Sequence, residues 1–344
     1  MSVRYRPMQP KDVAKCVEHI AVNPVLAPRY GASIEYLPPA LRGALGKGAT
    51  VAVVFEEFQD RATKFLGVGI AVFTTDDFLH EVKSTPNFWI APELSKRIAR
   101  GVSPLLSDAQ VRESNSTVGL NLVVWHDSSY PEDMTRAEVG TASMNAFDAS
   151  YRGYRLREVI SQADCIEHMW VMHNAGGLYF DQARGHYGDF PKVDRADFSD
   201  EPRSVGMTRE LALTHGASWV GSMFLHPAPQ FGFTRSEQRQ LSSALTGATD
   251  EELAHTSGIS LFTVKTTWRA IYDRVATSLP DLVPDRSQVD GARQGRGKQK
   301  KQRLLDYLRE HPEELRPVSR KLLRQAGLRV RVASKTESAL DTNS

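Results

Sequence analysis

The chain has 344 residues, of which 41% are hydrophobic, and this length and composition suit a globular protein with two domains and a tail. Its 43 Lys and Arg nearly balance 41 Asp and Glu, so no general affinity for polyanions follows from the net charge of +2. Cys16 and Cys165, the only cysteines, exclude a disulfide framework, and apolar runs such as residues 65–73 are too short to span a bilayer. With no apolar signal core at residues 1–12, we expect a cytoplasmic protein with no membrane partner.

Residues 1–229 predict an α/β domain with a mixed sheet, which we expect to sense a signal or to dimerise. Strands are expected at residues 3–8, 50–55, 64–73, 118–125, 166–173 and 217–225. Helices are expected at residues 10–20, 37–45, 91–100 and 136–150, and loops at residues 57–63 and 184–203. The Pro-rich residues 226–229 predict a stiff junction to the next domain.

The opening order of strand, two helices and two strands, with RPMQPKDV at residues 6–13, resembles the GNAT acyltransferase fold. That resemblance implies a sheet that clasps acyl coenzyme A, whose pyrophosphate binds at a helix N-terminus behind a loop of the form [QR]-x-x-G-x-[GA]. Arg152 and Gly153, in SYRGYRLR at residues 150–157, are the nearest candidates for binding this cofactor. Arg155 and Arg157 stand where the family usually has small residues and would fill the phosphate space, so we expect no catalytic residues and no enzyme activity. A pocket that retains acyl coenzyme A or takes another small molecule stays open.

Other candidate chemistry in this domain is sparse. Cys165, His168 and His173 have metal-binding side chains, but on a strand the first two point to opposite faces and no fourth ligand is evident, so no metal site is expected. His126 and Asp127, at the end of a predicted strand, suit either an acid/base pair or the start of a solvated loop. The sequence therefore predicts no metal and no cofactor.

Residues 233–275 show the sharpest pattern, with three successive helix starts. Thr234 with Glu237 forms a capping box, Thr249 precedes an acidic first turn, and Ser260 precedes a third helix. Gly247 and Gly258 end the first two helices. On the third helix an apolar stripe is expected to be buried, with Trp268 in the core, and it consists of Val264, Trp268, Ile271 and Val275. The opposite side carries Phe262, Lys265, Thr266 and Arg269.

This stretch resembles the LuxR/NarL-type DNA-binding domain, whose pattern reads T-x-x-E, then A-x-G-x-[ST]-x-x-E-[IL]-A, then S-x-x-T-V-K-x-H-x-x-x-I-x-x-[KR]-[LV]. The chain matches it at Thr234, Glu237, Ala244, Gly247, Thr249, Glu252, Leu253, Ala254, Ser260, Thr263, Val264, Lys265, Ile271, Arg274 and Val275. Thr267 replaces the common His, and one extra residue separates Ala244 from Gly247. Pro280 and Pro284 oppose the family's following helix, which often dimerises, so a homodimer stays an open alternative.

The resemblance implies a bacterial transcription regulator whose residues 230–285 form a helix-turn-helix domain that binds double-stranded DNA. We expect Phe262, Thr263 and Thr266 to contact base edges. Lys265 and Arg269 are expected to contact phosphates, aided by the helix N-terminus at Ser260. One alternative is an acyl-CoA-dependent N-acyltransferase with a regulatory DNA-binding module. The other is an adaptor whose three helices bind protein.

Residues 286–344 form a basic tail. A flexible linker is expected first, then an amphipathic helix at residues 302–310 with Leu304, Leu305 and Leu308 on one side, and a second helix at residues 318–325. Residues from Ser334 on are expected to be disordered. Beside a DNA-binding domain, such a tail would add phosphate contacts without sequence specificity; the alternative is a solvated tail.

Overall fold

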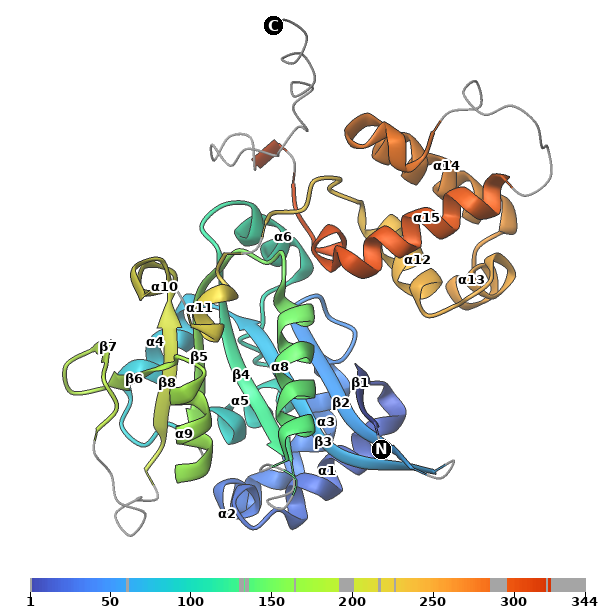
Figure 1. Cartoon of the computed structure of the whole chain (residues 1–344). Coiled ribbons are helices and arrows are strands. Elements are labelled where there is room, and N and C mark those ends of the chain that lie inside the picture. The colour runs from blue at the N-terminus through green and yellow to red at the C-terminus, as the bar shows by residue number, and fades with distance from the viewer. Residues whose placement is uncertain are drawn as a thin grey trace, which may run out of the picture. The chain divides into compact units, whose positions relative to one another are not determined.

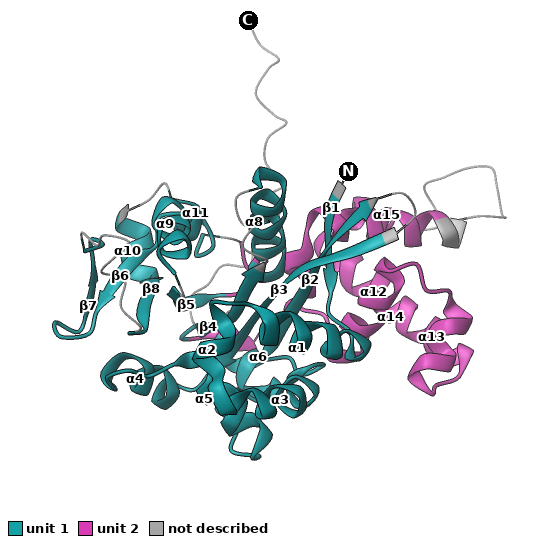
Figure 2. Cartoon of the chain, turned by 90° about the horizontal axis from the view of Figure 1, so that it is seen from below, with its two compact units in different colours: residues 1–114, 118–151, 155–226 teal, residues 115–117, 152–154, 227–344 magenta. Residues whose placement is uncertain are grey.

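The computed structural model describes residues 2–59, 62–129, 133, 136–163, 165–191, 201–215, 218–225, 227–284, 296–319 and 321–322. Its contacts divide the chain into two compact units (Figure 2). Unit 1 comprises Met1–Ser114, Val118–Tyr151 and Arg155–His226, and unit 2 comprises Asn115–Thr117, Arg152–Tyr154 and Pro227–Ser344. In the part of the chain that is described, no helix combines the length and the apolar character needed to cross a membrane.

Unit 1 is built on one mixed sheet of eight strands in the order β1-β2-β3-β4-β5-β8-β6-β7 (Figure 1). The strands are β1 Ser2–Pro7, β2 Thr50–Gln59, β3 Ala62–Thr74, β4 Leu120–Ser129, β5 Leu156–Ala163, β6 Leu178–Asp181, β7 His186–Gly188 and β8 Arg203–Thr208. β4 and β5 pair in parallel, and all other neighbours are antiparallel. The prediction of an α/β domain with a mixed sheet is therefore confirmed.

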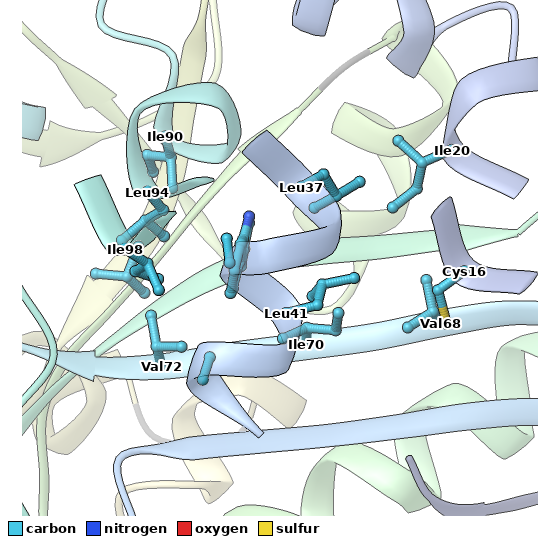
Figure 3. Packing of buried hydrophobic residues seen from close by; sticks show 14 of the residues in the cluster. Cys16, Ile20, Leu37, Leu41, Val68, Ile70, Val72, Ile90, Leu94 and Ile98 are labelled. Carbon is cyan, nitrogen blue, oxygen red and sulfur yellow. The ribbon is translucent and has the colours of Figure 1, made fainter. Parts of the chain in front are cut away.

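Helices cover both faces of this sheet (Figure 1). They are α1 Val13–Val22, α2 Leu26–Tyr30, α3 Leu37–Ala44, α4 Asp76–Ser84, α5 Ile90–Ala99, α6 Asp108–Ser116, α8 Ala137–Tyr151, α9 Ile166–Asn174, α10 Arg209–His215 and α11 Trp219–Ser222. The larger core joins the sheet to α1, α3 and α5 (Figure 3). A smaller core joins it to α8. Successive side chains of β2 point to opposite faces of the sheet, so Val54 belongs to the larger core and Phe55 to the smaller one.

Two predicted strands are wrong, since both segments form helices. Residues 166–173 lie in α9, where His168 and Met169 are buried while Trp170 and Val171 are exposed, so burial repeats with the helical period rather than alternating. Residues 219–222 form α11, which Ser218 caps by accepting a hydrogen bond from the Gly221 N–H. Apolar residues in a short segment suit a helix as well as a strand. For α11, the capping residue Ser218 was the overlooked signal.

Three further expectations about unit 1 need correction. The hairpin of β2 and β3 takes up most of the loop expected at residues 57–63, and β7 lies within the loop expected at residues 184–203. Residues 126 and 127 lie inside β4 rather than at its end. β5 was not predicted, although all but one of its residues are buried, because its charged residues Arg157 and Glu158 hide the apolar run.

Unit 2 contains helices α12 Arg235–Leu245, α13 Asp250–Ser257, α14 Leu261–Ser278 and α15 Arg296–Glu310, with short 3-10 turns η4 Pro280–Leu282 and η5 Pro312–Leu315. The first three helices and the first tail helix lie where the sequence predicts them. Leu304, Leu305 and Leu308 of α15 are buried in the same core as Leu241, Val264 and Ile271. The helical part of the tail thus belongs to the core of this unit. The expected helix at residues 318–325 and the expected disorder from Ser334 lie mostly or wholly outside the described residues.

Candidate nucleic-acid interface

The three helices of the candidate interface begin at the caps that the sequence predicts. Thr234 and Thr249 each form a complete capping box, with Glu237 and Glu252 respectively. Ser260 Oγ accepts the backbone N–H of Thr263 at 3.1 Å and starts α14. Gly258, in the left-handed conformation with φ 64°, ends α13 and turns the chain toward α14. These local interactions position the N-terminal end of α14.

One side of α14 is buried, as predicted, and its residues Val264, Trp268, Ile271 and Val275 lie in the core of unit 2. Trp268 is a core residue rather than a surface for base stacking, since it is 5% exposed. Its indole N–H donates to Asp250 Oδ1 at 3.0 Å, which joins α14 to the first turn of α13. The helix is therefore held rigidly along its apolar side.

The other side of α14 brings together all six predicted contact residues, and each of them is exposed: Ser260, Phe262, Thr263, Lys265, Thr266 and Arg269. Phe262 is 75% exposed, an unusual exposure for an aromatic ring. Lys265 and Arg269 form no ion pair with any described residue. The Thr266 hydroxyl donates to the Phe262 carbonyl at 3.0 Å, so its oxygen can still accept a hydrogen bond. This stripe, which we call the α14 face, offers two cationic side chains, an exposed ring and short hydroxyls.

Ion pairs hold the surrounding helices in place. Arg274 of α14 donates to Glu237 of α12 at 3.1 Å, and Glu237 is 4% exposed. Lys301 of α15 forms an ion pair with Asp250 at 2.8 Å and lies 4.8 Å from the centre of the Trp268 ring. The sequence pattern predicted the apolar side of α15 but not its docking position, because Lys301 and Asp250 are far apart in sequence.

A second buried carboxylate lies at the end of the described tail. Glu314 is 1% exposed and accepts the backbone N–H groups of Gln230 and Phe231, each at 2.9 Å. Burial raises the pKa of Glu314 to about 7, while the two backbone donors oppose that rise. It forms no ion pair within the described ranges. Glu314 thus joins the tail to the segment that precedes α12.

The two residues considered for cofactor binding, Arg152 and Gly153, do not form the expected phosphate loop. They follow the C-terminal end of α8, where the helix dipole repels anions, whereas the expected loop precedes a helix. Arg152 forms an ion pair with Glu313 at 2.9 Å, and its carbonyl accepts the Arg316 Nε–H at 2.8 Å. A side chain on Gly153, whose φ is 85°, would collide with Glu313. This arrangement does not fit a bound pyrophosphate.

The candidate metal ligands are also separated. Cys165 is the N-cap residue of α9, His168 is buried in its first turn and His173 is exposed near its end. Among the described side chains, no group of three or more His, Cys, Asp and Glu is placed to hold a metal ion.

His126 and Asp127 do not form an acid/base pair, because consecutive residues of a strand point to opposite faces. The His126 Nε2 lies 2.6 Å from the hydroxyl of Tyr30 in α2, and both residues are buried. Asp127 accepts a hydrogen bond from the Ser143 hydroxyl of α8 at 3.5 Å. The backbone pairing of β4 with β5 ends at Val123 and Ile160, although both strands continue. His126 and Asp127 therefore lie on opposite faces of the sheet, next to the point where β4 and β5 no longer pair.

No protein-family model matches this chain. No curated protein matches it either. Among solved structures, a protein described as histone acetyltransferase HPA2 and related acetyltransferase from Corynebacterium glutamicum is similar at 12% sequence identity and a TM-score of 0.34. The likeness covers 60% of this chain and 96% of that protein. A likeness at this level assigns neither a family nor an activity.

Proposed function

We propose that this chain is a transcription regulator whose unit 2 binds double-stranded DNA in the manner of LuxR-type domains. The observation that carries the proposal is the α14 face, where Phe262, Lys265 and Arg269 are exposed together on the N-terminal half of one helix. A major groove admits such a helix, and cationic side chains beside hydroxyls suit phosphates and base edges. The helix N-terminus at Ser260 adds a favourable dipole for a phosphate.

The contacts behind the α14 face support the same function. A protein that recognises a DNA sequence needs side chains that keep their positions. Helix α14 is anchored at Trp268 by Asp250 and at Arg274 by Glu237. Neither anchor uses a residue of the exposed face. The α14 face is therefore a rigid surface that is open to a partner.

The test is a salt titration of DNA binding by the full chain, because truncation at residue 285 would remove the α15 leucines from the core. We expect the affinity for mixed-sequence DNA to fall steeply with salt. Lys265→Ala with Arg269→Ala should weaken binding to all sequences and reduce the slope of log K against log[salt] by about 2. Lys15→Ala with Lys47→Ala removes the same charge from exposed positions of unit 1 and is the matched control.

The results separate the candidate functions. Equal weakening by both double variants would mean that only total charge matters and would reject the assignment of the α14 face. Absence of binding by the unaltered chain at low salt would reject DNA binding altogether, and would favour the adaptor alternative. A Phe262→Ala variant that binds mixed DNA normally but loses preference for a selected site would support base contact by that ring.

A second candidate function is acyl transfer by unit 1, as the GNAT resemblance implies. The specific observation in its favour is the end of the β4 and β5 pairing beside the buried Tyr30 and His126, which have the chemistry of an acid/base pair. The engagement of Arg152 and Gly153 opposes it. Thiol release from acetyl coenzyme A in the presence of amines, lost in His126→Gln, would establish this activity. No release above the rate of a heat-denatured sample would reject it.

A further inference from the structure

A cavity of about 350 Å³ lies within unit 1, on the side of the sheet that α8 and α9 cover. Side chains from β4, β5, α8, α9 and α11 form its wall, and most of them are apolar. They include Val124, Phe147, Val159, Met172, Trp219 and Met223. Ligand sites in proteins commonly have volumes of about 300–1,000 Å³ and predominantly apolar walls. The cavity is thus large enough for a small organic molecule.

The backbone explains why this space is not filled by the protein itself. β4 and β5 stop pairing after Val123 and Ile160, so their side chains diverge beside the cavity. Gly206 lines the cavity without a side chain, and a Cβ there would collide with the Val159 carbonyl of β5. A Cβ added to Gly140 of α8 would meet no atom within 4 Å. The glycines therefore leave the cavity open.

The rim of the cavity is apolar and accessible. Met144 of α8 is 41% exposed and Val171 of α9 is 55% exposed, and both line the cavity. Exposed apolar side chains around a concave site mark a place where an apolar ligand enters. The apolar part of a bound ligand would be shielded from water both at this rim and inside the cavity.

One carboxylate breaks the apolar wall. Asp127 of β4 is the charged residue among the described lining residues, and it accepts a hydrogen bond from the Ser143 hydroxyl, which also lines the cavity, at 3.5 Å. A carboxylate has about four lone-pair sites on its two oxygens, so it can accept from a ligand as well as from the Ser143 hydroxyl. A carboxylate in apolar surroundings favours a cation, which forms a shorter charge-assisted bond.

We propose that this cavity binds a small molecule with an apolar body and a protonated amine at one end, with the amine on Asp127. The apolar body lies among Phe147, Val159 and Trp219, and the Ser143 hydroxyl accepts or donates beside the amine. Such a ligand would be the signal that unit 1 senses. This binding is independent of the DNA binding proposed for unit 2, because it uses no residue of that unit.

The test uses the full chain without DNA, and two probes with one tail and opposite heads: octylamine and octanoate. Calorimetric titration should show saturable binding of octylamine and binding of octanoate at least ten times weaker. Asp127→Asn should abolish this discrimination. Equal binding of the two probes by the unaltered chain, or discrimination that persists in Asp127→Asn, would overturn the assignment of the head group to Asp127.

A second variant tests the cavity itself. Gly140→Phe places a ring in open space at the cavity wall and should prevent binding of octylamine, whereas Asn145→Phe, an exposed position of α8 outside the lining, should not. Circular dichroism and thermal unfolding of both variants check that they remain folded. Undiminished binding by the folded Gly140→Phe protein would place the ligand elsewhere and reject the proposal. Thiol release in the acetyl coenzyme A assay is a separate readout, so failure of either proposal leaves the other testable.

Discussion

Two of the buried carboxylates in unit 2 are held in different ways, Glu237 at the beginning of α12 and Glu314 near the end of the described tail. Glu237 accepts the Thr234 N–H at 2.7 Å and has the Arg274 guanidinium at 3.1 Å. Among the described residues, the hydrogen-bond donors to Glu314 are the backbone N–H groups of Gln230 and Phe231, and its pKa rises to about 7. Burial beside a guanidinium compensates the lost hydration of a carboxylate, whereas neutral donors compensate it only in part. The stability of the region around Glu237 therefore depends on an ionised carboxylate, whereas the region around Glu314 tolerates its protonation.

The largest expected effect comes from the core that both regions share. Leu304 of α15 is fully buried in that core, and Leu304→Ala should lower the free energy of unfolding by about 3 kcal/mol because it leaves a cavity. Denaturant unfolding followed by circular dichroism measures the change. The neighbouring exposed residue provides a control, since Arg303→Ala should change stability by less than about 0.5 kcal/mol. Equal effects of the two variants would mean that α15 is not part of this core.

The next effect is a pH dependence that Glu314 causes. The raised pKa means that the protonated carboxyl is favoured in the folded protein, so its stability contribution is complete below about pH 4.5 and is lost as the pH rises through about 7. Raising the pH from 5 to 8 should cost about 2 kcal/mol of unfolding free energy from this group. Its charged neighbours are Glu313, which raises the pKa, and His311, which lowers it.

Chemical denaturation at a series of pH values tests this expectation. Glu314→Gln keeps an oxygen for the backbone donors but does not ionise, so the fall in stability between pH 5 and pH 8 should become smaller in this variant. His311→Gln keeps Glu314 and separates the contribution of the neighbouring imidazole. The same slope in Glu314→Gln as in the unaltered chain would show that this carboxyl does not control the pH dependence.

The smallest expected effect is a difference in unfolding free energy between variants of two similar helix caps. Glu237→Gln removes a buried charge beside Arg274 and should cost about 2 kcal/mol, whereas Glu252→Gln, in the exposed capping box of α13, should cost much less. Thermal unfolding of both variants gives the difference. Similar losses would indicate that the cap, and not the ion pair with Arg274, stabilises α12.

The prediction from sequence succeeded in segments where short-range chemistry decides the structure. Thr234, Thr249 and Ser260 are capping residues whose partners lie three positions away, so the sequence alone locates the starts of α12, α13 and α14. The exposed residues of the α14 face follow from the same periodicity. Whether this face binds DNA stays a prediction.

The prediction failed where the decisive partners are remote. α9 was predicted as a strand because its apolar residues suit either structure, and β5 was missed because Glu158 looks like a surface residue. In the structure Glu158 is buried beside Lys83 at 2.9 Å and accepts the Tyr187 hydroxyl at 2.6 Å. These partners are far away in sequence, so no local pattern reveals that a charged residue belongs inside a sheet.

Local sequence is enough to place the helix starts of unit 2, the apolar and exposed sides of α14 and the α/β character of unit 1, because caps and periodicity act over a few residues. Tertiary contacts place α15 on Asp250, join Arg152 to Glu313 and form the cavity where β4 and β5 stop pairing. Each of these depends on segments that approach one another after the chain folds. Their free energy comes from burial and ion pairing between residues that are distant in sequence.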